Sequence, residues 1–226
     1  WDFFLVAPWF AGDRPPREVL NIGSAAGTIA RQYTLVYPGV HIDGVEIDPE
    51  IADAGRRFFD MDRANMTVHV GDGRPFLRSA GSRYDVIAVD AYRQPYIPFY
   101  LTTREFFEEV RGRLAEDGAV MVNVGKTPAD SAVVDAIAAT MRSVFPTVWS
   151  FPAGSFNQML VATVTPASSA GLAERIAFMP PEVAELAEEA LAGLKVIEPG
   201  GIVLTDDRAP VEWLTDQMII SYAVSQ

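Results

Sequence analysis

The sequence predicts a doubly wound α/β fold with a mostly parallel sheet of seven strands, and two short stretches carry this prediction. Val19–Gly27 runs from an apolar strand into a Gly-rich turn, and about twenty residues later Val45–Asp48 forms a strand that ends in carboxylates. Strands then keep alternating with helices, which predicts parallel βαβ units with helices on both faces of the sheet. This pattern is typical of a domain that binds a nucleoside.

Apolar runs and helix breakers define the expected elements. Asp48-Pro49 predicts a helix start, because Asp is a good N-cap and Pro suits the first turn. The expected strands cover residues 18–22, 41–47, 67–70, 84–89 and 119–124, followed by an antiparallel closing hairpin over 148–150 and 158–164. The expected helices cover residues 28–37, 51–59, 74–80, 103–114, 131–144 and 183–194. We expect one domain, with a lead-in segment over 1–17, the core sheet over 18–165, and C-terminal helices with a closing segment over 166–226.

Composition excludes several classes of function. The 226 residues carry a formal charge of −12, which argues against binding to nucleic acid and favours a cationic ligand. There is no cysteine, so disulfides and thiol chemistry are excluded. His41 and His69 lie in different elements, and no metal site is expected. No apolar run is long enough to span a membrane, so we expect a cytoplasmic protein. The aromatic segment Trp1–Phe10 is expected to pack on the sheet or on a missing neighbour.

Three expected strands deliver a carboxylate to the same edge of the sheet. These carboxylates are Glu46, Asp72 and Asp90. In an open parallel sheet, ligands bind beyond the carboxyl ends of the strands. Each residue alone could be a helix cap or a turn residue, but three in register point to a binding site.

The Gly-rich turn adds Gly23, Ser24 and Gly27 to this site. It lacks the G-x-G-x-x-G spacing and the Lys of a P-loop, and the surrounding carboxylates would repel a pyrophosphate. A nucleoside with a sulfonium cation would not be repelled. We therefore expect Glu46 to bind the ribose hydroxyls. Asp72 should accept a hydrogen bond from the adenine amino group, Ile47 should pack on the ring, and the adjacent Gly73 is also expected to bind the cofactor.

Several motifs together resemble the spermidine synthases, which are polyamine aminopropyltransferases with a Rossmann-like class I methyltransferase fold. The resemblance covers about residues 1 to 125 and is carried, in order, by VLNIGSAAG at 19–27, VEIDPE at 45–50, GDGRPF at 71–76, YDVIAVD at 84–90 and LTTREFF at 101–107. The ending LTDDRAPVE at 204–212 is similar to the spermidine-synthase-like subgroup, whose members are often joined to membrane transporter segments.

The resemblance implies S-adenosylmethionine or its decarboxylated form as co-substrate, with no metal, and an amine as acceptor. It implies that Asp90 is the catalytic base, since an attacking amine must lose a proton. It also leaves a homodimer and a link to a larger, membrane-bound protein open, and it implies that an upstream β-rich segment is missing here.

The chain departs from the family pattern at two positions. The family's Asp-Ser-Ser-Asp-Pro loop reads Asp90-Ala-Tyr-Arg93-Gln94 here, and a family aspartate in the Gly-rich turn is replaced by Ala26. At about 4 Å and an effective dielectric near 20, two like charges repel by roughly 4 kcal/mol, or about a thousandfold in affinity. Unless Arg93 turns outward or pairs with Asp206, Asp207 or Glu212, a neutral or anionic acceptor fits better than putrescine.

The sequence is also compatible with functions other than aminopropyl transfer. The chain could be a methyltransferase with an unknown acceptor, or a non-catalytic ligand-binding module of a larger protein. Two further groups have alternative interpretations. Asp206-Asp207 could form a turn or belong to the site. An aromatic cluster could cover the ligand or only pack within the protein. Its members are Tyr92, Tyr96, Phe99 and Tyr100.

Overall fold

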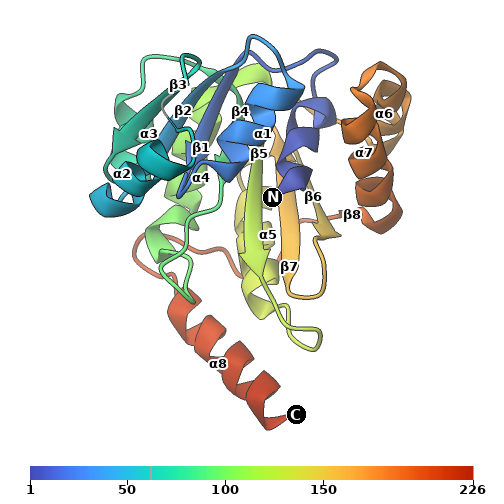
Figure 1. Ribbon diagram of the computed structural model, residues 1–226. Coiled ribbons are helices and arrows are strands. Elements are labelled where there is room, and N and C mark those ends of the chain that lie inside the picture. Colours follow the sequence, from blue (N-terminus) through green and yellow to red (C-terminus); the bar gives the residue numbers. More distant parts are fainter. Residues whose placement is uncertain (62, 226) are drawn as a thin grey trace.

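The computed structural model describes residues 1–61 and 63–225, and its centre is an eight-stranded sheet (Figure 1). The strand order is β3-β2-β1-β4-β5-β7-β6-β8. The first five strands are parallel, and β7 inserts antiparallel between β5 and β6. The strands are β1 (Glu18–Ile22), β2 (His41–Glu46), β3 (Met66–Val70), β4 (Tyr84–Val89), β5 (Leu114–Gly125), β6 (Thr147–Pro152), β7 (Asn157–Thr163) and β8 (Lys195–Val196). The expected fold class and closing hairpin are confirmed, and the two-residue β8 is added at one edge.

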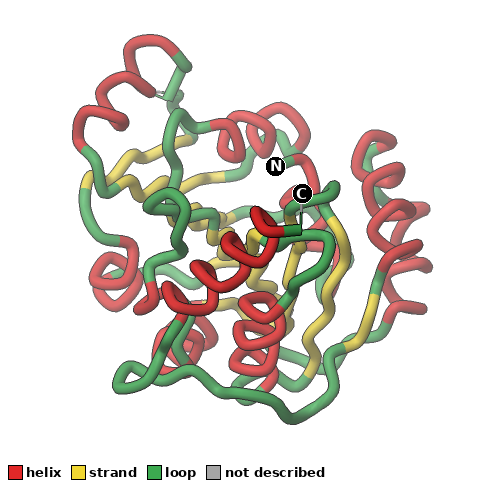
Figure 2. Tube along the Cα trace, turned by 90° about the horizontal axis from the view of Figure 1, so that it is seen from below, coloured by secondary structure: helices red, strands yellow, loops and turns green. Residues whose placement is uncertain are grey.

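Helices cover both faces of the sheet, as Figure 2 shows from below. The α-helices are α1 (Thr28–Val36), α2 (Pro49–Phe58), α3 (Gly73–Ser79), α4 (Arg104–Arg113), α5 (Ala132–Arg142), α6 (Ser169–Arg175), α7 (Pro181–Gly193) and α8 (Val211–Val224). The short 3₁₀ helices are η1 (Asp2–Phe10), η2 (Phe99–Leu101) and η3 (Ile176–Phe178). None of the helices in the described residues is both long and apolar enough to cross a bilayer.

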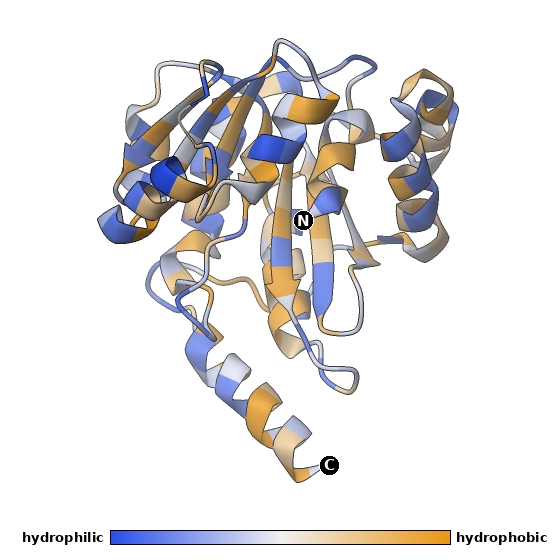
Figure 3. Cartoon of the chain, viewed as in Figure 1, coloured by the Kyte–Doolittle hydropathy of each residue, from blue (hydrophilic) through white to orange (hydrophobic). Residues whose placement is uncertain are grey.

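Alternating strand residues build two apolar cores. On β4, Ile87 and Val89 pack with α3, α4 and α5, whereas Val86 and Ala88 pack with η1, α1 and α7. Because both faces are covered, β4 is apolar from Val86 to Val89, whereas Asp85 near its start accepts the backbone N–H groups of Arg17 and Glu18. Figure 3 shows many apolar residues along the central strands and a mixture of apolar and hydrophilic residues along the helices.

The aromatic lead-in segment forms η1 and packs on the sheet. Phe4, Trp9 and Phe10 are each 1% exposed and belong to the second core. Trp9 donates its indole N–H to the hydroxyl of Tyr37 at 2.9 Å, which joins η1 to the end of α1. Of the two expectations for this segment, packing on the sheet is confirmed.

The C-terminal helix α8 extends from the side of the sheet to which the parallel strands point (Figures 1 and 2). Its residues 211–224 were expected only as part of a C-terminal region of helices with a closing segment. Apolar residues lie all around α8, so the sequence has no single apolar stripe to mark it.

Candidate functional site

The strand order places four sequence-predicted residues in a row along the carboxyl edge of the sheet. Across β3, β2, β1 and β4 the row reads Asp72, Glu46, Gly23 and Asp90. Neighbouring strands are about 4.8 Å apart, so the row spans roughly 14 Å. An extended nucleoside with a short chain on its ribose has this scale.

The Gly-rich turn after β1 has a backbone that requires glycine. Gly23 has a φ of 85°, and a Cβ there would lie 2.5 Å from the carbonyl oxygen of Asp90. Gly27 has a φ of 80° and is the N-cap of α1. Ser24 donates its backbone N–H to β2, and its buried hydroxyl lies beside Gly44, without a hydrogen-bond partner among the described residues. The turn therefore faces the site mainly through its backbone.

Glu46 holds two loops together at the end of β2. It is 7% exposed, and its Oε2 accepts the Ala25 N–H at 2.8 Å while its Oε1 accepts the Asp48 N–H at 3.0 Å. Hydrogen bonds to a carboxylate are stronger than neutral ones, so the Gly-rich turn and the start of α2 are fixed relative to each other. Next to it, Ile47 is 62% exposed and offers an apolar surface at the edge.

Asp72 begins α3 and lies near an aromatic ring. Its carboxylate accepts the Arg74 N–H at 2.9 Å and so caps the helix. Burial, together with the nearby charge of Asp72, raises the pKa of Tyr100 to about 12. Gly73 is buried, and a Cβ there would lie 2.4 Å from a methyl carbon of Ile22, so the absence of a side chain lets the N-terminus of α3 approach the sheet closely.

Asp90 carries a hydrogen bond on each carboxylate oxygen. The Asn123 side-chain amide donates to its Oδ1 at 2.9 Å, and the Trp1 indole N–H donates to its Oδ2 at 2.8 Å. Asp90 is partly exposed, so its carboxylate can be reached from the edge of the sheet. Oxygen atoms of a carboxylate accept more than one hydrogen bond each, so both remain able to accept a ligand N–H.

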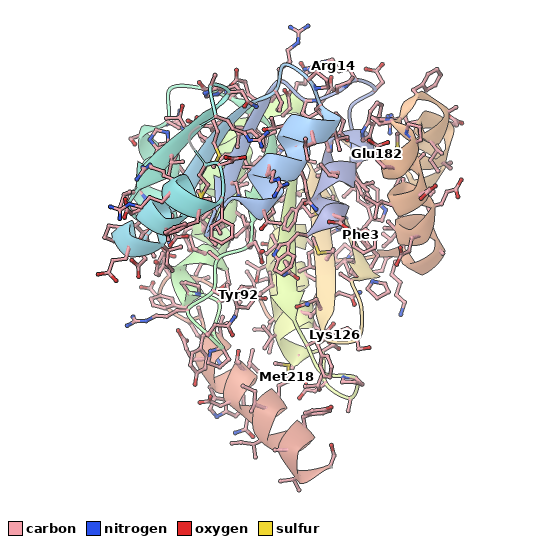
Figure 4. All side chains as sticks on the ribbon, viewed as in Figure 1. Phe3, Arg14, Tyr92, Lys126, Glu182 and Met218 are labelled. Atoms are coloured by element: carbon pink, nitrogen blue, oxygen red, sulfur yellow. The ribbon has the colours of Figure 1, made fainter. Side chains whose placement is uncertain are left out.

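The aromatic cluster connects the site to its surroundings. Its members are Tyr92, Tyr96, Phe99 and Tyr100. The Tyr92 hydroxyl donates to the Asn123 carbonyl at 3.0 Å and accepts the Gly125 N–H at 2.8 Å. The Tyr96 hydroxyl donates to Asp216 of α8 at 2.7 Å. Phe99 is 41% exposed and packs edge-on against Tyr100. Tyr92 is thus held within the protein by its hydrogen bonds and its packing on the core, whereas part of the Phe99 ring is exposed and accessible to a ligand. Figure 4 shows Tyr92 in the lower half of the molecule, between the sheet and α8.

A buried arginine that the sequence analysis did not single out joins the C-terminal segment to the site. Arg74 is 6% exposed and donates to both carboxylate oxygens of Asp206, at 2.8 and 2.9 Å, and to Glu109 at 2.9 Å. It also donates to the Tyr100 carbonyl at 3.0 Å. Hydrogen bonding to Arg74 lowers the pKa of Asp206. The ion pair between Asp206 and Arg74 therefore holds the C-terminal segment against the start of α3.

Arg93 does not form the ion pairs that the sequence analysis considered. Its side chain is exposed, and within residues 1–61 and 63–225 it forms no ion pair with Asp206, Asp207 or Glu212. Its backbone pairs with Tyr96 across a tight turn. A guanidinium without an ion-pair partner among the described residues therefore follows Asp90 in the loop.

Both histidines have carboxylate partners away from the row. His69 bonds to Asp43 at 2.8 Å, and His41 bonds to Glu18 at 3.0 Å. Over the part of the chain that the structure describes, no group of three or more His, Asp or Glu residues is arranged to hold a metal ion.

Sequence reasoning missed Asn123, Trp1 and Arg74 as neighbours of the site. A signal existed for Asn123, because it is the one polar residue in the apolar run from Ala119 to Val124. Arg74 lies within the GDGRPF stretch, directly after Gly73, but its partner Asp206 is 132 residues away.

The fold is the doubly wound α/β fold that spermidine synthases share with class I methyltransferases, and the predicted site residues lie in a row along the carboxyl edge of its sheet. A solved spermidine synthase in complex with the transition state analogue AdoDATO has the same fold, with a TM-score of 0.69 and 18% identity over 84% of this chain and 69% of that chain. The sequence also matches the family model of the spermine/spermidine synthase domain over residues 8–156. The chain therefore belongs to the spermine/spermidine synthase family.

Individual relatives agree with this assignment. A polyamine aminopropyltransferase of Vibrio vulnificus is 35% identical over 66% of this chain and 51% of its own length. A probable polyamine aminopropyl transferase of Bifidobacterium longum is 33% identical over 99% of this chain and 55% of its own length. A putrescine N-methyltransferase of Nicotiana attenuata is 34% identical over 67% of this chain and 44% of its own length. The chain spans about half the length of these relatives, all of which are transferases.

Proposed function

We propose that this chain catalyses aminopropyl transfer from decarboxylated S-adenosylmethionine to an amine. The observation that carries the proposal is the position of Asp90, next to the Gly-rich turn and with its carboxylate oriented by a side-chain amide. Membership of the family supports the same reaction. The relatives named as polyamine aminopropyltransferases favour it over a methyltransferase or a binding module.

The order of residues along the edge suggests how the nucleoside lies. Adenine would contact the exposed Ile47 and reach Asp72, and the ribose hydroxyls would bond to Glu46. The sulfonium would then lie over the Gly23 turn, close to Asp90. This direction follows from the strand order β3-β2-β1-β4, which runs from Asp72 to Asp90. The carboxylates also attract the positive charge of the sulfonium.

The chemical step needs one proton acceptor. The nitrogen lone pair of the amine attacks the aminopropyl carbon bonded to sulfur, and the carbon–sulfur bond breaks with its electron pair left on sulfur. The products are methylthioadenosine and an alkylated amine, whose extra proton passes to the Asp90 carboxylate. Holding the amine and the carbon in line supplies most of the rate enhancement, and the carboxylate supplies acid–base catalysis.

Two assays test this function. A ligand at one hundred times its Kd stabilises a fold by about 2.7 kcal/mol, so methylthioadenosine and decarboxylated S-adenosylmethionine should raise the melting temperature clearly. The protein should also release methylthioadenosine from the decarboxylated donor when it is given a panel of cationic, neutral and anionic primary amines. Release of S-adenosylhomocysteine from S-adenosylmethionine, with no methylthioadenosine from the decarboxylated donor, would show a methyltransferase instead.

A further inference from the structure

One polar side chain on β5 reaches the proposed base. Val89 of β4 pairs with Val122 of β5, so Asp90 and Asn123 come next along the two neighbouring strands. The Asn123 Nδ2–H donates to Asp90 Oδ1 at 2.9 Å. The parallel register itself therefore brings the amide to the carboxylate.

The position of Asn123 is fixed from two sides. Its backbone pairs with Met159 of β7, and its carbonyl accepts the hydroxyl of Tyr92 at 3.0 Å. The same hydroxyl accepts the Gly125 N–H at 2.8 Å. Burial raises the pKa of Tyr92, so the hydroxyl stays protonated and can keep donating. The amide thus approaches Asp90 from a strand end that cannot easily shift.

The orientation of the Asn123 amide follows from its chemistry. Only the NH₂ end can face a carboxylate, because an amide oxygen and a carboxylate oxygen are both acceptors. In this orientation the Asn123 Oδ1 points into the protein, where it is buried and has no hydrogen-bond partner among the described residues. A buried acceptor without a donor destabilises a fold. The arrangement thus leaves the Asn123 Oδ1 without a partner among the described residues but places the amide N–H on the Asp90 carboxylate.

We propose that Asn123 is a positioning residue for aminopropyl transfer, which holds Oδ1 of Asp90 and thereby turns Oδ2 towards the attacking amine. The inference rests on the proposed function. Oδ2 is the oxygen at the exposed side of the carboxylate, where the Trp1 indole also donates. Asn123 does not bind the substrate; it acts through Asp90, so its loss should change the rate of the chemical step more than the binding of the nucleoside.

The test compares variants with the same number of side-chain heavy atoms. Asn123→Leu removes the donor and keeps the branching at Cγ, and Asn123→Asp replaces the donor by a second carboxylate. We expect kcat to fall about 10- to 100-fold in the first and further in the second, with the KM for decarboxylated S-adenosylmethionine changed less than threefold. Asn21→Leu is the matched control, because Asn21 is a fully buried amide on β1 whose polar atoms make no hydrogen bond among the described residues. Its kcat should stay within threefold of the wild type.

A double-mutant cycle shows whether Asn123 acts through Asp90. In an Asp90→Ala background, Asn123→Leu should lower the residual kcat less than twofold. An undiminished effect in that background would overturn the inference, as would a wild-type kcat in Asn123→Leu. The second measurement uses the NMR resonances of the Asn123 side-chain amide, which should move when Asp90 is replaced by Ala. Unmoved resonances would show that the contact is absent. Failure of the wild type to release methylthioadenosine with any amine would instead refute the proposed function.

Discussion

Replacing Arg93 by Asp should convert the acceptor preference of this protein towards diamines. Arg93 follows Asp90 in the loop after β4, is exposed, and forms no ion pair among the described residues. A diamine that places one nitrogen at Asp90 carries its second ammonium group away from the nucleoside. If that group comes near Arg93, the guanidinium repels it, whereas a carboxylate at the same position attracts it.

The exposure of Arg93 sets the size of the effect. Two charges about 4 Å apart interact by about 1 kcal/mol in water and about 4 kcal/mol at an effective dielectric of 20. Because the side chain is exposed, the lower figure applies. Reversing the sign of the charge then changes the interaction by about 2 kcal/mol, which corresponds to roughly a 30-fold change in affinity. This is smaller than the thousandfold exclusion that the sequence alone suggests.

The assay measures kcat/KM for putrescine and for a neutral primary amine of similar length. Arg93→Asp should raise the value for putrescine roughly 30-fold and leave the neutral amine within threefold, and the gain should shrink at high salt. Arg83→Asp is the control for charge, since it makes the same charge change just before the amino end of β4, although it also removes the hydrogen bond from Arg83 to the Leu114 carbonyl. A gain below threefold in Arg93→Asp, or an equal gain in the control, would refute the electrostatic reasoning.

Three further predictions concern the frame of the site. Glu46→Gln leaves one of two loop N–H groups without its acceptor, so it should lower the free energy of unfolding by about 1–3 kcal/mol. It should also remove most of the increase in melting temperature that methylthioadenosine causes. An unchanged increase would contradict the proposal that Glu46 binds the ribose hydroxyls. Arg74 lowers the pKa of Asp206, so this stabilisation is complete above the ordinary carboxyl pKa near 4 and is lost as the pH falls through the lowered pKa. Urea titrations should therefore show Arg74→Met to be less stable by about 1–3 kcal/mol at pH 7, with the difference reduced at pH 3; a constant difference would argue against the ion pair. Gly73→Ala forces a Cβ against β1 and should cost about 1–3 kcal/mol in thermal melts, whereas the same change at Gly81, where the space is open, should cost less.

Local sequence patterns predicted most of the sheet because its central strands, which are covered on both faces, are mostly apolar, as at residues 86–89 and 119–124. The cap at Asp48 and the following Pro49 located α2, and the structure shows Asp48 accepting the Glu50 N–H at 2.8 Å. The row of carboxylates followed from a rule about parallel sheets, which needs only the strand ends and not their contacts.

The contacts that shape the site could not be predicted in the same way. The bond from Asn123 to Asp90 depends on the register of β4 and β5, and the ion pair of Arg74 with Asp206 joins segments far apart in the sequence. Helix α8 has apolar residues all around it, so its period is hidden. Each of these features depends on tertiary structure, which a local pattern does not contain.

The central claim is that Asp90 accepts the proton of an amine that attacks decarboxylated S-adenosylmethionine at this edge of the sheet. The most direct test uses a donor with an isotope label in its aminopropyl group and compares the wild type with Asp90→Asn, which keeps the shape of the side chain. We predict that the wild type transfers the label to an amine and releases one methylthioadenosine per transfer. The variant should bind methylthioadenosine with an equal melting shift but lose at least 99% of the turnover, about a hundredfold effect. Undiminished transfer by Asp90→Asn would contradict the account.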